Sequence, residues 1–205
     1  MWYFLVKGGW MMLPLALCSV VAVTVIIERF FFFRGLRGSN RAEEVIGLAR
    51  KGSLDEALRI ADETERQKGR PMPVMKVLSA GLSHPFDPTG AMETAATTEV
   101  SAMKRGLVAL DTIITLSPLL GLLGTIIGMI NAFNIMAAAG LGQPHAVTGG
   151  VAEALVCTAA GISVAVVSLV PYNYFLSRVE GETEVIETYA TRLELAMGAT
   201  AKERQ

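Results

Sequence analysis

One glutamate and two threonines are the polar residues best placed to do chemistry in this chain. Glu153 is the only acidic residue in an apolar stretch from about Ala146 to Phe175. An ionisable side chain at membrane depth costs about 2.5 to 3.5 kcal/mol, so its presence marks a functional site by default. With a helix rise of about 1.5 Å per residue, Thr125 and Thr158 fall near the middle third of a bilayer. Their depth predicts that the two threonines line one polar path, and the cost of an ionisable group at this depth predicts a role in ion passage for Glu153.

Helix geometry separates Glu153 from Thr158. The two residues are five positions apart, which is about 140° around a helix. If Thr158 faces a central partner, Glu153 therefore faces a neighbouring helix or subunit. Two structural alternatives stay open. Glu153 could bond across a helix interface without any role in ion passage, and a membrane threonine can simply bond a carbonyl one turn back in its own helix.

The remaining polar residues form no catalytic constellation. Serine, histidine and aspartate do not cluster, and the sequence has no phosphate-binding loop. The only two cysteines, Cys18 and Cys157, lie in apolar segments, and neither histidine has partners at metal-ligand spacing. We therefore expect no enzymatic activity, no cofactor, no metal and no nucleic-acid partner.

Three apolar segments are long enough to place these groups in a membrane. The chain has 205 residues and is 52% hydrophobic, while about 20 apolar residues suffice to span the hydrocarbon core. These features predict an all-α membrane protein with three transmembrane helices and short soluble helices. The expected segments are an N-terminus (1–8), a first span (9–33), a helical loop (34–106), a second span (107–138), a link (139–146), a third span (147–175) and a helical tail (176–205).

The positive charges predict the orientation. Of the 18 Lys and Arg residues, twelve lie between Arg34 and Arg105, four lie after Phe175 and none lies in 139–148. The positive-inside rule then places the loop and the C-terminus in the cytoplasm, with the N-terminus and the link in the periplasm. A cleaved signal peptide is the alternative for the first segment. The single Lys7 before it, outweighed by arginines after it, argues against that alternative.

The soluble loop shows helix-start signals and no strand alternation. Asn40 and Ser53 are each followed three residues later by glutamate, which is the pattern of a capping box. We expect short helices over 42–51, 54–68 and 74–82.

The second and third spans are expected to be longer than a bilayer. From about Thr89 apolar residues recur at helical spacing into the second span, and the same spacing continues from Val179 along the tail. Two long antiparallel helices extending into the cytoplasm follow from this pattern. Glu28 and Arg29 close the first span, where we expect their charged ends to reach the lipid headgroups.

Small residues form one stripe on each of these two spans. In lipid, such stripes allow helix backbones to approach closely. They could join the two helices of one chain or join separate subunits. The residues that we expect at the closest contacts are Gly121, Gly124 and Gly128 in the second span and Gly150, Ala154 and Gly161 in the third.

Two of these segments resemble a known family. The run LSPLLGLLGTIIGMI at 116–130 closely resembles the second-span signature of the MotA/TolQ/ExbB proton channel family. The run AEALVCTAAG at 152–161, followed by PYN at 171–173, is similar to its third-span signature, and IIERF at 26–30 is similar to the end of its first span. The resemblance covers the three spans, and the three-span layout is closer to ExbB/TolQ than to the flagellar MotA type.

The resemblance implies a function and partners. It implies a homo-oligomer, a pentameric ring, around a dimer of single-span ExbD/TolR-type subunits that each carry a membrane aspartate, in the bacterial inner membrane. On this basis Thr125 and Thr158 would line a proton route, and Glu153 would be the third-span glutamate of the family. Such a ring would energise outer-membrane work, acting with a TonB- or TolA-like protein. A structural scaffold with no ion flux is the alternative.

Overall fold

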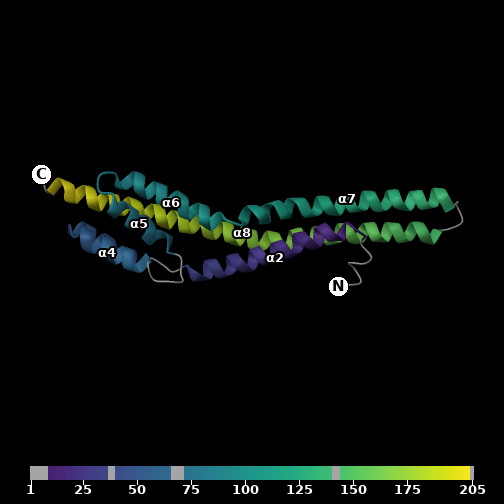
Figure 1. Cartoon of the computed structure of the whole chain (residues 1–205), viewed down its shortest axis with the longest axis horizontal. Coiled ribbons are helices and arrows are strands. Elements are labelled where there is room, and N and C mark those ends of the chain that lie inside the picture. The colour runs from purple at the N-terminus through teal and green to yellow at the C-terminus, as the bar shows by residue number, and fades with distance from the viewer. Residues whose placement is uncertain (1–8, 37–39, 66–71, 140–143, 204–205) are drawn as a thin grey trace. The chain divides into compact units, whose positions relative to one another are not determined.

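Every regular element in the described part of the chain is an α-helix. The computed structural model describes residues 9–36, 40–65, 72–139 and 144–203 (Figure 1). The all-helical prediction is therefore confirmed. The helices are α2 (Met12–Gly35), α3 (Asn40–Arg50), α4 (Leu54–Glu65), α5 (Pro73–Ser83), α6 (Pro88–Lys104), α7 (Leu107–Ala139) and α8 (Pro144–Glu203).

Three helical stretches among the described residues are long and apolar enough to cross a membrane. They are Met12–Gly35, Pro88–Ala137 and Thr148–Ala199, so the predicted number of spans is confirmed. The predicted N-terminus (1–8) and most of the predicted link (139–146) lie outside the described residues.

The predicted continuous helix from Thr89 into the second span is interrupted. α6 ends at Lys104 and α7 begins at Leu107. Gly106, between them, adopts a positive φ of 83°, a backbone conformation that side chains with a Cβ disfavour. The apolar spacing that suggested one helix therefore continues through a glycine-dependent break.

The chain divides into two compact units. The first, here called the membrane unit, comprises the chain up to Arg29 together with Gly106–Tyr174. The second, here called the polar unit, comprises Phe30–Arg105 and the chain from Phe175 onward. α2 and α8 each contribute residues to both units.

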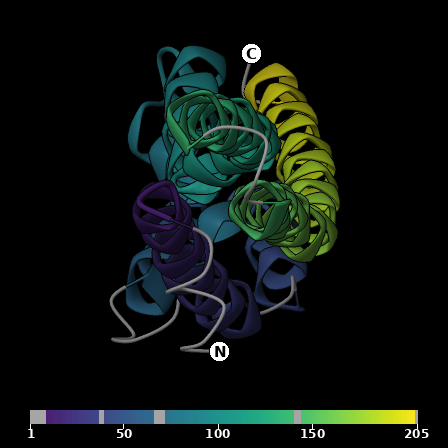
Figure 2. The same ribbon diagram turned by 90° about the vertical axis from the view of Figure 1, so that its right-hand side faces the viewer.

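In the membrane unit, α2, α7 and the first part of α8 lie side by side (Figures 1 and 2). A small core forms where Met11, Met12 and Leu15 pack with Cys157 of α8. Most large apolar side chains on the three helices instead point outward; Leu13 and Val108, for example, are each 73% exposed. An apolar exterior of this extent fits contact with lipid or with other membrane helices.

Arg29 does not behave as the sequence predicted. Its side chain is only 5% exposed and pairs with Glu28 at 2.6 Å. A Cβ placed on Gly106 would lie 3.7 Å from Arg29 Nε. The arginine is therefore packed against the turn that begins α7, and the expectation that it reaches toward the headgroups is wrong for Arg29. Tertiary contacts, which local sequence does not reveal, decided this difference.

The polar unit has a core drawn from several helices. α3, α4 and α5 pack in sequence order, and α5 packs on α6. The helical spacing predicted along the tail is confirmed by burial, because Val179, Ile186 and Leu193 are all buried. Phe33 stacks on Phe175 with ring centroids 5.6 Å apart. These contacts give α8 an apolar stripe that is covered within this unit.

Charged contacts join α3 to α8 in the polar unit. The Arg192 guanidinium donates to both Glu43 carboxylate oxygens at 2.6 and 2.7 Å, and the Tyr189 hydroxyl donates to one of them at 3.1 Å. The capping-box pattern predicted that Glu43 would turn back toward the start of its own helix. The helix does begin near the predicted position, at Asn40, but the Glu43 carboxylate binds α8.

This ion pair predicts acid sensitivity. The hydrogen bond from Arg192 holds the pKa of the Glu43 carboxyl below its ordinary value. Because the folded pKa is the lower one, the pair stabilises the fold above the ordinary pKa and loses that effect as pH falls through the folded pKa. We expect the thermal midpoint of wild type to fall more between about pH 6 and about pH 3 than that of Glu43→Gln. Glu44→Gln, which changes the exposed neighbouring residue, should keep the wild-type profile; equal profiles for all three proteins would contradict the prediction.

Candidate functional site

The close contact between α7 and α8 in the membrane unit is made of small residues. A Cβ on Gly121 would lie 3.0 Å from Thr158 Cα, and a Cβ on Gly128 would lie 2.8 Å from the Ala154 Cβ. Distances this short leave no room for a side chain, since they fall at or below the closest real Cβ contacts. We call this contact the α7–α8 seam.

The other predicted packing residues lie in the same seam. A Cβ on Gly150 would lie 2.8 Å from the Ala132 Cβ, and one on Gly124 would collide with the Cys157 thiol. A Cβ on Gly161 would collide with the backbone carbonyl of Ser117. The structure therefore brings all six predicted small residues to contacts between two helices of a single chain.

Thr158 bridges the seam through its hydroxyl. The Thr158 Oγ1 donates to the backbone carbonyl of Gly121 at 2.9 Å. The threonine is half-buried. Bonds of this type between membrane helices contribute about 0.6 kcal/mol on average. The absence of a side chain on Gly121 lets the two backbones approach closely enough for this bond.

Thr125 uses its hydroxyl within its own helix. Its Oγ1 donates to the Leu122 carbonyl at 2.6 Å, and the residue is half-buried. Among the residues that the structure describes, Thr125 and Thr158 share no hydrogen bond. Both hydroxyl protons are thus committed to backbone carbonyls, which leaves both oxygens available as acceptors.

Glu153 lies on a different side of α8 from Thr158. It is exposed, and its carboxylate borders Gly9, where any added Cβ would collide with it. Gly9 has a φ of 68° and starts the turn that leads into α2. The angular separation inferred from the sequence is reflected in these two neighbours, Gly121 for Thr158 and Gly9 for Glu153.

Sequence reasoning missed Gly9 and the role of the residues just before α2. Met11 also reaches the seam, because a Cβ on Gly124 would lie 3.7 Å from the Met11 Cβ. A glycine immediately before an apolar run was the only available signal. It indicates a turn but does not say which helix the turn will meet.

In residues 9–36, 40–65, 72–139 and 144–203 no group of three or more His, Cys, Asp or Glu side chains could hold a metal ion. Each of the two threonine hydroxyls donates to a backbone carbonyl and can accept one further hydrogen bond.

These features define a class of protein: an α-helical multi-pass membrane protein in which a threonine hydroxyl bridges a tightly packed seam between two helices. A model of the MotA/TolQ/ExbB proton channel family matches residues 71–188, which is more than half of the chain and includes the seam. The chain belongs to this family, and the resemblance seen in the sequence is confirmed. It is therefore a non-enzymatic membrane transport component.

Individual relatives agree with this assignment. An ExbB-like 1 biopolymer transport protein from Synechocystis is 32% identical over 194 residues, covering 92% of this chain and 76% of the relative. The ExbB-like 3 protein of the same organism is 33% identical over 192 residues, and the match covers 92% of this chain and 90% of that relative. The Tol-Pal system protein TolQ of Pseudomonas aeruginosa is 36% identical over 90 residues, and the match covers 44% of this chain and 39% of that relative.

Proposed function

We propose that this chain is the ring subunit of an inner-membrane motor that uses the proton motive force to drive work at the outer membrane. The observation that carries the proposal is the Thr158 hydroxyl at the α7–α8 seam, which donates to the Gly121 carbonyl. In a proton channel family, a membrane hydroxyl with a free acceptor oxygen suits proton transfer. The Thr125 hydroxyl also donates to a backbone carbonyl, that of Leu122 in its own helix, and its oxygen is likewise left as an acceptor.

The titrating group of the route is supplied by a partner. A protonated carboxyl donates one hydrogen bond, so its natural neighbours are acceptors such as Thr125 and Thr158. A carboxylate can take up a proton and release it again, whereas a threonine hydroxyl does not change its protonation state near neutral pH. The partner is an ExbD/TolR-type dimer of single-span subunits, each with a membrane aspartate, and the ring around it is a homo-pentamer. A TonB- or TolA-like protein receives the force.

The orientation follows from charge. The N-terminus and the link at 139–146 face the periplasm, while the polar unit and the C-terminus face the cytoplasm. Support comes from the distribution of Lys and Arg, with none of the 18 in residues 139–148. The broad apolar exterior of the membrane unit fits a lipid environment.

Glu153 provides the test of the ring and its coupling. After co-expression with its single-span partner, the Glu153→Gln complex should keep the native mass of wild type. In proteoliposomes, however, its proton uptake should fall by about tenfold. This decrease corresponds to an increase of about 1.4 kcal/mol in the barrier to proton passage. Glu180→Gln, an exposed change on the same helix within the polar unit, is the matched control.

One result would contradict the role of Glu153, and another would contradict the proposal as a whole. Full uptake in Glu153→Gln would reduce the residue to a packing role. Absence of any proton uptake in the wild-type complex, with the ring intact, would favour a non-conducting scaffold.

A further inference from the structure

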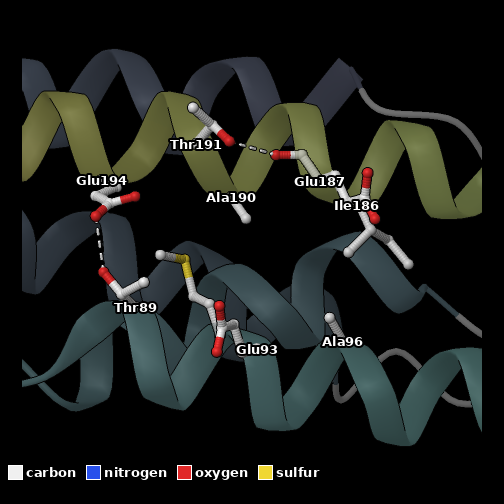
Figure 3. Close-up of a pocket in the computed structure, with 9 residues that line it drawn as sticks. Thr89, Glu93, Ala96, Ile186, Glu187, Ala190, Thr191 and Glu194 are labelled. Carbon is white, nitrogen blue, oxygen red and sulfur yellow. Dashed lines mark hydrogen bonds between the residues drawn. The ribbon is translucent and has the colours of Figure 1, made fainter.

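A hollow lies between α6 and α8, entirely within the polar unit (Figure 3). It encloses about 190 Å³. Its apolar part includes Met92 and Ile186, which are buried, together with the half-buried Ala96 and Ala190. Small-molecule sites usually measure about 300 to 1,000 Å³, so this hollow has room for one or two side chains and too little for a cofactor.

Three carboxylates surround the apolar part of the hollow. Glu93 belongs to α6, and Glu187 and Glu194 belong to α8; all three are exposed. Figure 3 shows them around the space between the two helices. Glu194 accepts a hydrogen bond from the Thr89 hydroxyl at 2.9 Å. Within the described residues, no Lys or Arg forms a salt bridge with any of the three.

Two other carboxylates of this unit are paired with a cation from a different helix. Glu43 binds Arg192, and Glu99 of α6 binds Lys76 at 2.8 Å. The acidic rim of the hollow thus differs from these two sites, where a carboxylate is paired with a cation from another helix. Charge complementarity then favours an external cation beside an apolar group.

We propose that this hollow is a docking groove for a basic amphipathic helix of another polypeptide. Such a helix would place one apolar side chain between Ala96 and Ala190 and set Lys or Arg residues against the three glutamates. This is the helix-in-groove mode of recognition. The acidic rim repels anionic lipid headgroups. The groove lies apart from Thr125, Thr158 and Glu153, so the inference stands independently of the proposed proton route.

The test uses the full chain in nanodiscs of neutral phosphatidylcholine. The probe is a fluorescent 18-residue amphipathic peptide of leucine and lysine, and binding is measured by anisotropy against empty nanodiscs. We expect the triple variant Glu93→Gln, Glu187→Gln, Glu194→Gln to bind about tenfold more weakly than wild type. A matched triple, Glu44→Gln, Glu180→Gln, Glu184→Gln, removes the same charge from exposed positions outside the groove and should bind within about twofold of wild type.

The apolar part of the groove has its own variant. Ala190→Trp should fill the hollow and weaken binding by about tenfold with the three carboxylates intact. Equal weakening in the two triple variants would reduce the effect to diffuse charge and overturn the proposal. Unchanged binding in Ala190→Trp would overturn it as well. A changed native oligomer mass in the groove triple would assign the groove to a neighbouring copy of this chain, which also excludes the proposed occupant.

Discussion

Gly161→Ala is expected to destabilise the membrane unit, although alanine normally favours a helix over glycine by about 1 kcal/mol. The added methyl would collide with the Ser117 carbonyl and would lie 3.1 Å from Gly121 Cα. Both obstacles are backbone atoms of α7, which cannot rotate away as a flexible side chain could. Overpacking of this kind costs about 1 to 3 kcal/mol. Thermal unfolding of the purified protein in detergent should show a lower midpoint, and Gly161→Leu should yield little folded protein.

Gly149→Ala is the control, because it makes the same substitution at a position of α8 where the added methyl group has open space. A Cβ on Gly149 meets nothing within 4 Å, although the residue is in the same helix and next to the tightly packed Gly150. Gly149→Ala should therefore keep or raise the midpoint, because only the helix preference remains. A Gly161→Ala protein that melts at or above wild type would show that the seam is looser than these contacts require.

Thr158→Val is expected to separate proton passage from assembly. Valine keeps the shape of threonine and removes the hydroxyl that donates to the Gly121 carbonyl. The loss to stability should be close to the average of about 0.6 kcal/mol for such bonds in membranes. Proton uptake by the complex should fall by at least about tenfold, since the acceptor oxygen of the proposed route is gone.

Restoring the oxygen distinguishes chemistry from shape. Thr158→Ser keeps the hydroxyl and loses a methyl group, so it should regain most of the uptake even if its thermal midpoint falls slightly. Native mass should be unchanged in both variants. Wild-type uptake in Thr158→Val would remove this residue from the route, and a dissociated ring would make the hydroxyl an assembly contact.

Much of the fold was open to prediction because it depends on local properties. Apolar length alone determined three candidate spans, and spacing along the tail identified Val179, Ile186 and Leu193 as a buried face. The small-residue stripes likewise identified six of the positions in the seam. Glycine spacing carries this information because it records which side of a helix can approach another backbone.

Contacts between residues that are far apart in the sequence could not be predicted from such local patterns. The partner of Glu43 could not be read from its capping pattern, because the competing Arg192 lies 149 residues away. The apolar spacing predicted a continuous helix, but the structure has a break at Gly106. In both cases a local pattern was compatible with more than one structure.

The sequence by itself determined that this chain is a helical membrane protein of a proton channel family, with threonines and one glutamate in its spans. Only the tertiary structure decided where those groups point: the Thr158 hydroxyl to the Gly121 carbonyl, the Glu153 carboxylate to Gly9, and Arg29 into a packed position. The physical reason is that hydropathy and spacing belong to one helix at a time. The register between helices is set by how their side chains fit together.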